Sequence, residues 1–147
     1  PIIKSVVDDF NSIYKLKRGI NISYKNDGTN KYLIYGIENR IEQIIANLLD
    51  NAISFSDDNK DVVVQVSKSE DNKVYIKILD EGQGFKEKDT NKIFKRFYSN
   101  RPDKFGQHSG LGLNIVKNLV DLHNATIKAT NRQDKKGASM EIEFPKV

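Results

Sequence analysis

The segment RIEQIIANLLDNAISFS, residues 40–56, carries a regular apolar pattern that predicts a helix. Its apolar residues recur at positions i, i+3, i+4, i+7, i+8 and i+11, which places them on one face over several turns. They are Ile41, Ile44, Ile45, Leu48, Leu49 and Ala52. A helix with one apolar face has to pack against another layer of structure, so the neighbouring segments should supply a sheet.

Short β-branched and aromatic runs lie on both sides of this helix and predict strands. The turn signal NDGTN separates the first two as a hairpin. An apolar helical run opens the chain and stops at Gly19. A broader run, residues 110–123, predicts a well-buried helix with Ile115 and Leu122 on its apolar face. The predicted strands are residues 20–24, 31–35, 61–66, 74–79, 125–130 and 138–144.

The order of these elements predicts an α+β fold, specifically a two-layer sandwich. We expect a mixed, mostly antiparallel sheet of about five strands with about three helices on one face. With 147 residues and 37% hydrophobic content, the chain is sized for a single domain over residues 1–147. It starts with Pro1 rather than Met, inside a helical run, so we expect a piece of a longer protein.

Composition excludes several classes of protein. The chain has no cysteine, which rules out disulfides and thiolate metal sites and is compatible with the cytoplasm. No apolar run approaches the roughly 18 residues of a membrane span, so we expect no membrane contact by this segment. The net charge of +4, from 24 basic and 20 acidic residues, is too mild to require a nucleic acid. Residues 86–104 hold seven basic and three acidic residues, and nucleic-acid binding there is the lesser alternative.

Two asparagines flank the apolar face of the helix over residues 40–56. Asn47 and Asn51 lie four residues apart, so both project from the same side, at the boundary between core and solvent. An amide there offers an oxygen to a hard cation such as Mg²⁺ and an N–H to a phosphate. Ordinary helix-surface residues are the alternative interpretation.

The run DEGQGF, residues 80–85, follows the predicted strand 74–79 directly. Strand alternation puts Asp80 on the inward side, together with Ile76 and Ile78. A buried carboxylate needs a partner, and the exocyclic amine of a purine would be one. Gly82 and Gly84 let the backbone approach a ligand closely. A simple turn beginning at Asp80 is the other possibility.

The third segment, the glycine-rich run GQHSGLGLNI, opens the helix predicted over residues 110–123. Glycine turns that lead into a helix present free N–H groups and the positive end of the helix dipole, which suits a phosphate. The run lacks the Lys-Ser or Lys-Thr of a Walker A loop and the spacing of a dinucleotide-binding fold. A plain helix-entry turn remains the alternative.

Taken together, the three runs resemble the nucleotide-binding fold of the gyrase, Hsp90, histidine kinase and MutL superfamily, and they do so over essentially the whole chain. Within that superfamily the chain looks like the catalytic ATP-binding domain of a bacterial sensor histidine kinase. Residues 40–56 resemble the kinase N box, DEGQGF the first glycine box, IFKRFY the F box and HSGLGL the second glycine box.

The resemblance implies roles for the residues of these boxes. Asn51 would coordinate Mg²⁺, Asn47 would act near the phosphates during catalysis, and Asp80 would bind the adenine amine of ATP. The glycines shape the adenine pocket and contact the triphosphate, and one phenylalanine packs against the purine. The further nucleotide-binding residues implied in this way are Phe55, Gly82, Gly84, Phe94, Gly110, Leu111, Gly112 and Leu113.

Residues 82–109 would form a mobile lid over the bound ATP. By resemblance, Phe94 and Phe97 anchor this lid, and Arg96 or Arg101 reaches the γ-phosphate as a catalytic group. For the phenylalanines, plain core packing stays open as an alternative.

Three positions depart from the family pattern. Ser54 stands where many of these kinases have a lysine, and Ser99 stands where many have an arginine. His108 replaces the first glycine of the second glycine box, so we expect the lid to close differently.

The residue at position 47 bears on the reaction. Hydrolysing members of the superfamily carry a glutamate there as a general base, and an amide cannot accept the proton. Asn47 therefore favours phosphoryl transfer to a partner, and the F box favours a histidine kinase over a serine kinase. Neither His108 nor His123 suits the role of phosphoacceptor, because in this family the acceptor lies on a separate helical domain.

The resemblance also implies partners. They are the dimerisation and phosphoacceptor domain of the same kinase and a response regulator downstream. We expect a monomeric fragment of a homodimeric kinase, located in the cytoplasm as part of a membrane-anchored receptor. A degenerate ATP-binding module, an anti-sigma serine kinase or a regulatory ATPase of the same superfamily is the alternative.

Overall fold

The computed structural model describes residues 2–26, 36–56, 58–82, 84 and 111–145. The predicted strand 31–35 and most of the predicted lid lie outside these ranges. Within the described ranges, three helices and five strands follow one another. They are α1 (Ile2–Arg18), β1 (Asn21–Asn26), α2 (Glu38–Phe55), β2 (Asp61–Lys68), β3 (Val74–Leu79), α3 (Leu111–Leu122), β4 (Thr126–Asn131) and β5 (Ala138–Phe144).

The strands form one sheet in the order β1-β2-β3-β5-β4. β1 and β2 run parallel, which the long connection through α2 permits, and the other neighbouring pairs are antiparallel. The central pair, β3 and β5, joins segments far apart in the sequence, with Ile76 opposite Ile142. The described part of the chain thus has the mixed, mostly antiparallel sheet that the sequence predicted.

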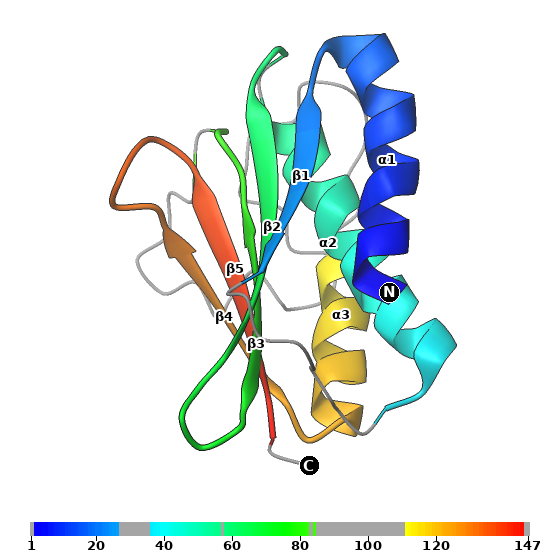
Figure 1. Ribbon diagram of the computed structural model, residues 1–147, viewed down its shortest axis with the longest axis vertical. Coiled ribbons are helices and arrows are strands. Elements are labelled where there is room, and N and C mark those ends of the chain that lie inside the picture. The colour runs from blue at the N-terminus through cyan, green and yellow to red at the C-terminus, as the bar shows by residue number, and fades with distance from the viewer. Residues whose placement is uncertain (1, 27–35, 57, 83, 85–110, 146–147) are drawn as a thin grey trace.

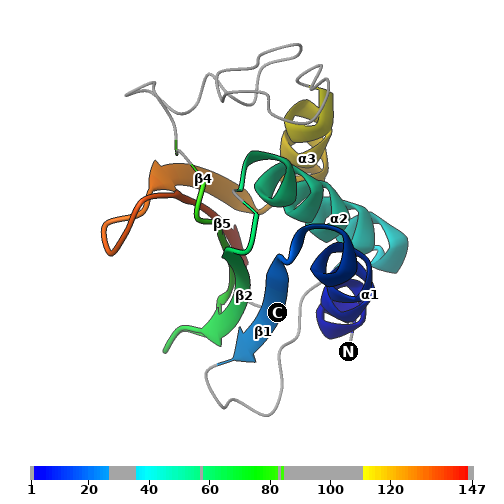
Figure 2. The same cartoon turned by 90° about the horizontal axis from the view of Figure 1, so that it is seen from above.

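The three helices lie together on one face of this sheet (Figures 1 and 2). α1 ends at Arg18, one residue before Gly19, where the sequence predicted a stop. Seen from above, α2 lies between α1 and α3, and it contacts both (Figure 2). The prediction of a two-layer α+β sandwich is confirmed.

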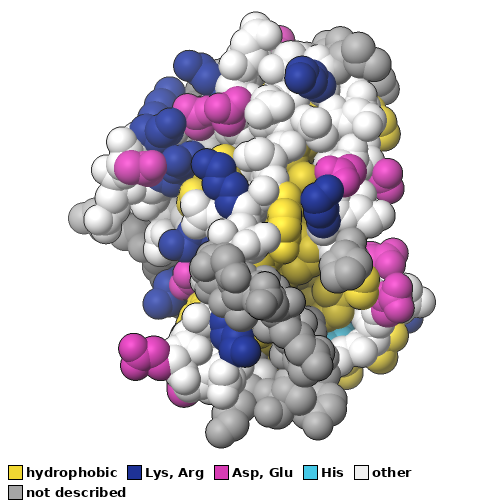
Figure 3. All heavy atoms as spheres, viewed as in Figure 1, with side chains coloured by type: hydrophobic (Ala, Val, Ile, Leu, Met, Phe, Trp, Pro, Cys, Tyr) yellow, Lys and Arg dark blue, Asp and Glu magenta, His cyan; other side chains and the backbone are white. Residues whose placement is uncertain are grey.

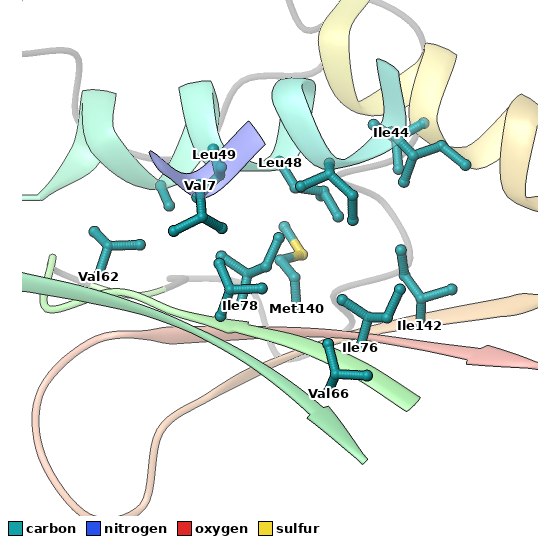
Figure 4. Close-up of a cluster of buried hydrophobic side chains, with 14 of the residues drawn as sticks. Val7, Ile44, Leu48, Leu49, Val62, Val66, Ile76, Ile78, Met140 and Ile142 are labelled. Carbon is teal, nitrogen blue, oxygen red and sulfur yellow. The ribbon is translucent and has the colours of Figure 1, made fainter. Parts of the chain in front are cut away.

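The core fills the space between the two layers (Figure 4). The predicted stripe on α2 supplies its helical side, where Ile44, Ile45 and Leu49 have no exposed surface. The sheet supplies alternate residues, such as Ile76 and Ile142, and burial alternates strictly along β3. Each such side chain contributes about 1.5–3 kcal/mol when it is removed from water. The apolar face of α2 and the inward residues of the strands meet in this core, and their burial holds the helix and sheet layers together.

The other face of the sheet carries polar and charged side chains that pair across strands. Lys77 Nζ lies 3.6 Å from Glu141 Oε2. The Tyr75 hydroxyl donates a 2.7 Å hydrogen bond to Glu143, which raises the pKa of Tyr75 to about 12. Figure 3 shows basic and acidic side chains mixed over the side where β4 and β5 lie, and apolar ones between the layers. None of the helices in the described ranges has the length and apolarity needed to cross a bilayer.

Candidate functional site

The end of α2 and the segment after β3 meet at one end of the sandwich. Ser56, which follows α2, pairs with Gly82 in an isolated antiparallel bridge. Phe55 precedes Ser56, and Asp80 lies two residues before Gly82. The fold thus brings the end of the predicted N box beside the first glycine box, which are separated by strands β2 and β3 in the chain.

The two asparagines of α2 differ in exposure. Asn47 is half-buried, as expected for a residue at the boundary of the core. Asn51 is buried, with 9% of its surface exposed, so the expectation that it sits at the solvent boundary was wrong. The sequence pattern takes account of the inner face of α2 only, whereas α1 and α3 also cover its flanks.

Asp80 lies at the centre of the site and is 3% exposed. The parity prediction that it points inward with Ile76 and Ile78 is confirmed. Its Oδ1 accepts two backbone hydrogen bonds, from Gly82 N at 2.9 Å and from Ala138 N at 3.1 Å. The carboxylate therefore has partners within the protein, in addition to the purine amine that the sequence analysis considered as a partner.

Glu81 points to a different neighbour. Its Oε2 accepts a 2.8 Å hydrogen bond from the backbone N–H of Asp61, at the start of β2. This bond, followed by the charge of Lys135 at 3.5 Å, lowers the pKa of Glu81 below its ordinary value. Glu81 thus ties the first glycine box to the beginning of β2.

Two residues that touch Asp80 were missed by the sequence analysis. Arg132 Nη1 donates to the carbonyl oxygen of Asp80 at 3.1 Å. Gly137 lies so close that a side chain there would overlap the same carbonyl oxygen, and its φ of 145° also favours glycine. Both belong to the predicted turn RQDKKG, and no local spacing links that turn to a residue more than 50 positions earlier. The signal that the sequence offered was Gly137 itself, a glycine directly before a predicted strand, which can indicate a close approach of another backbone segment.

The glycine and aromatic positions predicted around Asp80 are buried. Gly82 and Gly84 are both buried, and Gly84 has a φ of 79°, a value that favours glycine. A side chain on Gly84 would collide with the amide of Asn131. Phe55 is 5% exposed, but in the described ranges it lies outside the central apolar cluster. Its position at the edge of the core leaves both core packing and purine contact open.

The predicted glycine-rich helix entry is described only from Leu111 onward, where α3 begins. Leu113 packs partly buried against the core. The prediction of a well-buried helix was wrong for Ile115 and Leu122, which are 38% and 64% exposed, because the stripe on α3 is wider than the surface that α2 and β4 cover. The remaining predicted residues lie outside the described ranges: Phe94, Arg96, Phe97, Arg101, His108 and Gly110.

His123 follows the last residue of α3 and is 8% exposed. Its Nε2 accepts a 3.2 Å hydrogen bond from the backbone N–H of Ile37, the N-cap of α2. Its Nδ1 lies 2.7 Å from the carbonyl oxygen of Leu119 and can only donate to it. The ring is therefore the neutral tautomer with its proton on Nδ1, and it joins the end of α3 to the beginning of α2.

The site thus combines a buried carboxylate and glycine turns with an amide-bearing helix. Residues 36–147 match the family of histidine kinase-, DNA gyrase B- and HSP90-like ATPases, and the chain belongs to that family.

The similarity extends to individual proteins. The chain is 34% identical over 143 residues to the sensor protein ChvG of Agrobacterium fabrum, a match that covers 92% of this chain and 24% of ChvG. The chain thus spans about a quarter of the length of that relative.

Among solved structures, the nucleotide-free catalytic domain of the histidine kinase ThkA superposes with a TM-score of 0.82 at 25% identity, covering 99% of this chain and 90% of that domain. ThkA in complex with the response regulator TrrA gives a TM-score of 0.80 at 22% identity, covering 99% of this chain and 40% of that one. The second likeness concerns the fold alone.

Proposed function

We propose that this domain binds Mg²⁺–ATP and transfers the γ-phosphoryl group to a histidine on a separate dimerisation and phosphoacceptor domain of the same kinase. The observation that carries the proposal is the buried Asp80 carboxylate, held at the end of the sandwich where the asparagine helix α2 also ends. The sensor-kinase relatives support the same reaction class.

Asp80 would select the base. A carboxylate that is 3% exposed and already oriented by two backbone N–H groups can accept a further hydrogen bond from the adenine amine. Guanine has a carbonyl oxygen at the corresponding position, so a carboxylate there repels it. Phe55, Gly82 and Gly84 would shape the pocket around the base.

Asn51 would hold Mg²⁺. Magnesium binds oxygen ligands and usually keeps few protein groups, with phosphate oxygens and water completing its shell. In the part of the chain that the structure describes, no group of three His, Cys, Asp or Glu side chains gathers to form a metal cage. A single buried amide fits a cation carried mainly by the nucleotide. When bound, Mg²⁺ neutralises charge on the phosphates.

Asn47 supports transfer rather than hydrolysis. It lies one turn before Asn51 on α2, half-buried, and its amide cannot take a proton from water. His123 is unsuited to receive the phosphoryl group, because it is buried and both ring nitrogens are engaged. The resemblance argues against His108 as well, so the acceptor histidine would come from another domain.

Residues of the lid would complete the reaction. We assign the γ-phosphate contact to Arg96 or Arg101, the anchoring of lid 82–109 to Phe94 and Phe97, and triphosphate contacts to the backbone of residues 110–113. In this assignment residues 1–147 act as one catalytic unit, and the phosphorylated histidine passes its phosphoryl group to a response regulator.

A reconstitution experiment tests the proposal. The chain is incubated with labelled Mg²⁺–ATP and a separately made acceptor-helix domain of a sensor kinase, alongside the same domain with its histidine replaced. Acid-labile phosphohistidine on the intact acceptor domain alone is the expected result. ATP binding without transfer would indicate a degenerate regulatory module, and absence of ATP binding would overturn the nucleotide site itself.

A further inference from the structure

We propose that the β4–β5 hairpin is the positioning element for Asp80, and that Arg132 is a positioning residue that sets the preference for adenine over guanine. This inference rests on the proposed binding of ATP by Asp80. It assigns a role to a segment, residues 132–137, that lies more than 50 residues away in the chain and outside every predicted nucleotide-binding box.

Arg132 is anchored on two sides. Its Nε and Nη2 donate to the two carboxylate oxygens of Asp134 at 3.0 and 2.8 Å, a bidentate pair that fixes the plane of the guanidinium. With the plane fixed, Nη1 donates to the carbonyl oxygen of Asp80 at 3.1 Å. The Arg132 side chain is only 7% exposed, whereas the Asp134 side chain is 65% exposed. Arg132 is therefore a buried side chain whose guanidinium is held by three hydrogen bonds, unlike a mobile arginine on the surface.

The hairpin also holds the other polar groups of Asp80. The Asp80 N–H donates to the carbonyl oxygen of Ala138 at 3.0 Å, and Ala138 N–H donates to Asp80 Oδ1 at 3.1 Å. Gly137 allows this approach, because any side chain would overlap the Asp80 carbonyl. The Arg132 N–H donates to Gly137 O at 2.9 Å, which closes the hairpin on itself.

A second contact links the hairpin to the next residue of the glycine box. Lys135 Nζ lies 3.5 Å from Glu81 Oε1, and Glu81 is itself held by the backbone N–H of Asp61. Asp80 and Glu81 are thus both tied to residues 132–138. The loop that presents the carboxylate is clamped from one side by this hairpin.

The position of the Asp80 carboxylate affects ATP binding because a hydrogen bond to a base weakens steeply when its angle or distance is poor. In catalysis, a misplacement of about 1 Å can cost about a hundredfold in rate. Loss of Arg132 would leave the Asp80 carbonyl without this donor and let the segment shift. The adenine amine would then lose part of its bond, whereas GTP, which gains nothing from Asp80, would be little affected.

The test compares Mg²⁺–ATP and Mg²⁺–GTP affinities by calorimetry, together with thermal unfolding, for the 147-residue chain and a set of variants. Arg132→Ala should lower ATP affinity about tenfold and narrow the ratio of ATP affinity to GTP affinity by a similar factor, and Arg132→Lys should recover part of the loss. Asp134→Ala, a change at an exposed residue that should leave the fold intact, should act in the same direction but more weakly. Lys136→Ala, an exposed residue of the same hairpin, is the matched control and should change neither affinity.

Asp80→Asn separates this inference from the proposed function. If Asp80→Asn narrows the ATP to GTP ratio while Arg132→Ala and Asp134→Ala leave it unchanged, the positioning role is overturned and the adenine site stands. If Asp80→Asn leaves the ratio unchanged, the adenine role of Asp80 is wrong and the inference falls with it. A lower unfolding temperature for Arg132→Ala with an unchanged ratio would assign Arg132 to stability alone.

Discussion

At the scale of single residues, the sequence predicted the burial of Asp80 correctly and the burial of Asn51 incorrectly. Strand alternation was enough to turn Asp80 inward, because side chains in a strand alternate strictly between the two faces. Helical spacing was not enough for Asn51, because a helix has a continuous circumference and its neighbours decide how far burial extends around it.

Substitution of Asn51 is therefore expected to have two effects. Asn51→Ala should abolish the Mg²⁺-dependent part of ATP binding, and it should also lower the free energy of unfolding by about 1 kcal/mol because the site is buried. ATP titrations with and without Mg²⁺, paired with urea unfolding, measure both. Ser54→Ala, on the same helix but half-buried, serves as control. Unaltered Mg²⁺–ATP affinity in Asn51→Ala would remove this residue from the site.

Glu81 gives a prediction about pH. Its pKa is lowered in the folded state, mainly by the bond from Asp61 N–H, so its contribution to stability is present above the ordinary value of about 4.3. That contribution is lost as the pH falls through the lower pKa of the folded state. Glu81→Gln should therefore cost about 1 kcal/mol at neutral pH and less near pH 3, below the ordinary pKa.

Urea unfolding of wild type and Glu81→Gln at both pH values measures this difference. Glu70→Gln, at an exposed position in the turn between β2 and β3, provides the control. A difference between wild type and Glu81→Gln that is the same at both pH values would mean that the charge of Glu81 does not strengthen the bond to Asp61.

At the scale of elements, the sandwich is held by contacts that cross from one element to another at their ends. His123 joins the end of α3 to the N-cap of α2, whose Ile37 offers no side-chain cap of its own. The His123 ring, which follows α3, accepts a hydrogen bond from the N-terminus of α2. Such an acceptor is usually supplied by a residue of the same helix. The orientation of α2, and with it the placement of Asn47 and Asn51, depends in part on this bond.

Replacing His123 should therefore destabilise the fold. In His123→Leu, the Ile37 N–H loses its acceptor and Leu119 O loses a donor, which should cost about 1–3 kcal/mol in the free energy of unfolding. His123→Gln, which can both donate and accept, should recover part of that loss. Thermal or urea unfolding measures the effect, and equal stability of wild type and His123→Leu would show that neither hydrogen bond contributes.

At the scale of the whole molecule, local patterns predicted most of the fold. Three helices, the alternation of β3 and the layer arrangement follow from periods of 3.6 and 2 that can be read in single segments. What local patterns could not supply is the contact of Arg132 and Gly137 with Asp80, because it depends on which strands become neighbours. The sheet order, with β5 beside β3, creates that contact.

The chain as a whole should bind ATP without retaining phosphate on itself. His123 is buried and engaged at both ring nitrogens, so it offers no nucleophile to the γ-phosphate. Incubation with labelled ATP, followed by gel analysis under alkaline conditions that preserve phosphohistidine, should give no labelled chain. Label that disappears in His123→Gln or in His108→Gln would contradict this expectation.

The place of β5 between β3 and β4 also governs how the domain can be made. β3 ends at Leu79 and its partner β5 begins only at Ala138, so a ribosome must synthesise the intervening residues before the centre of the sheet can close. Until then β1, β2 and β3 can pair among themselves, but the edge of β3 that later pairs with β5 has no hydrogen-bonding partner. Pairing across such a separation is slow, and an open edge in a newly made chain attracts other strands.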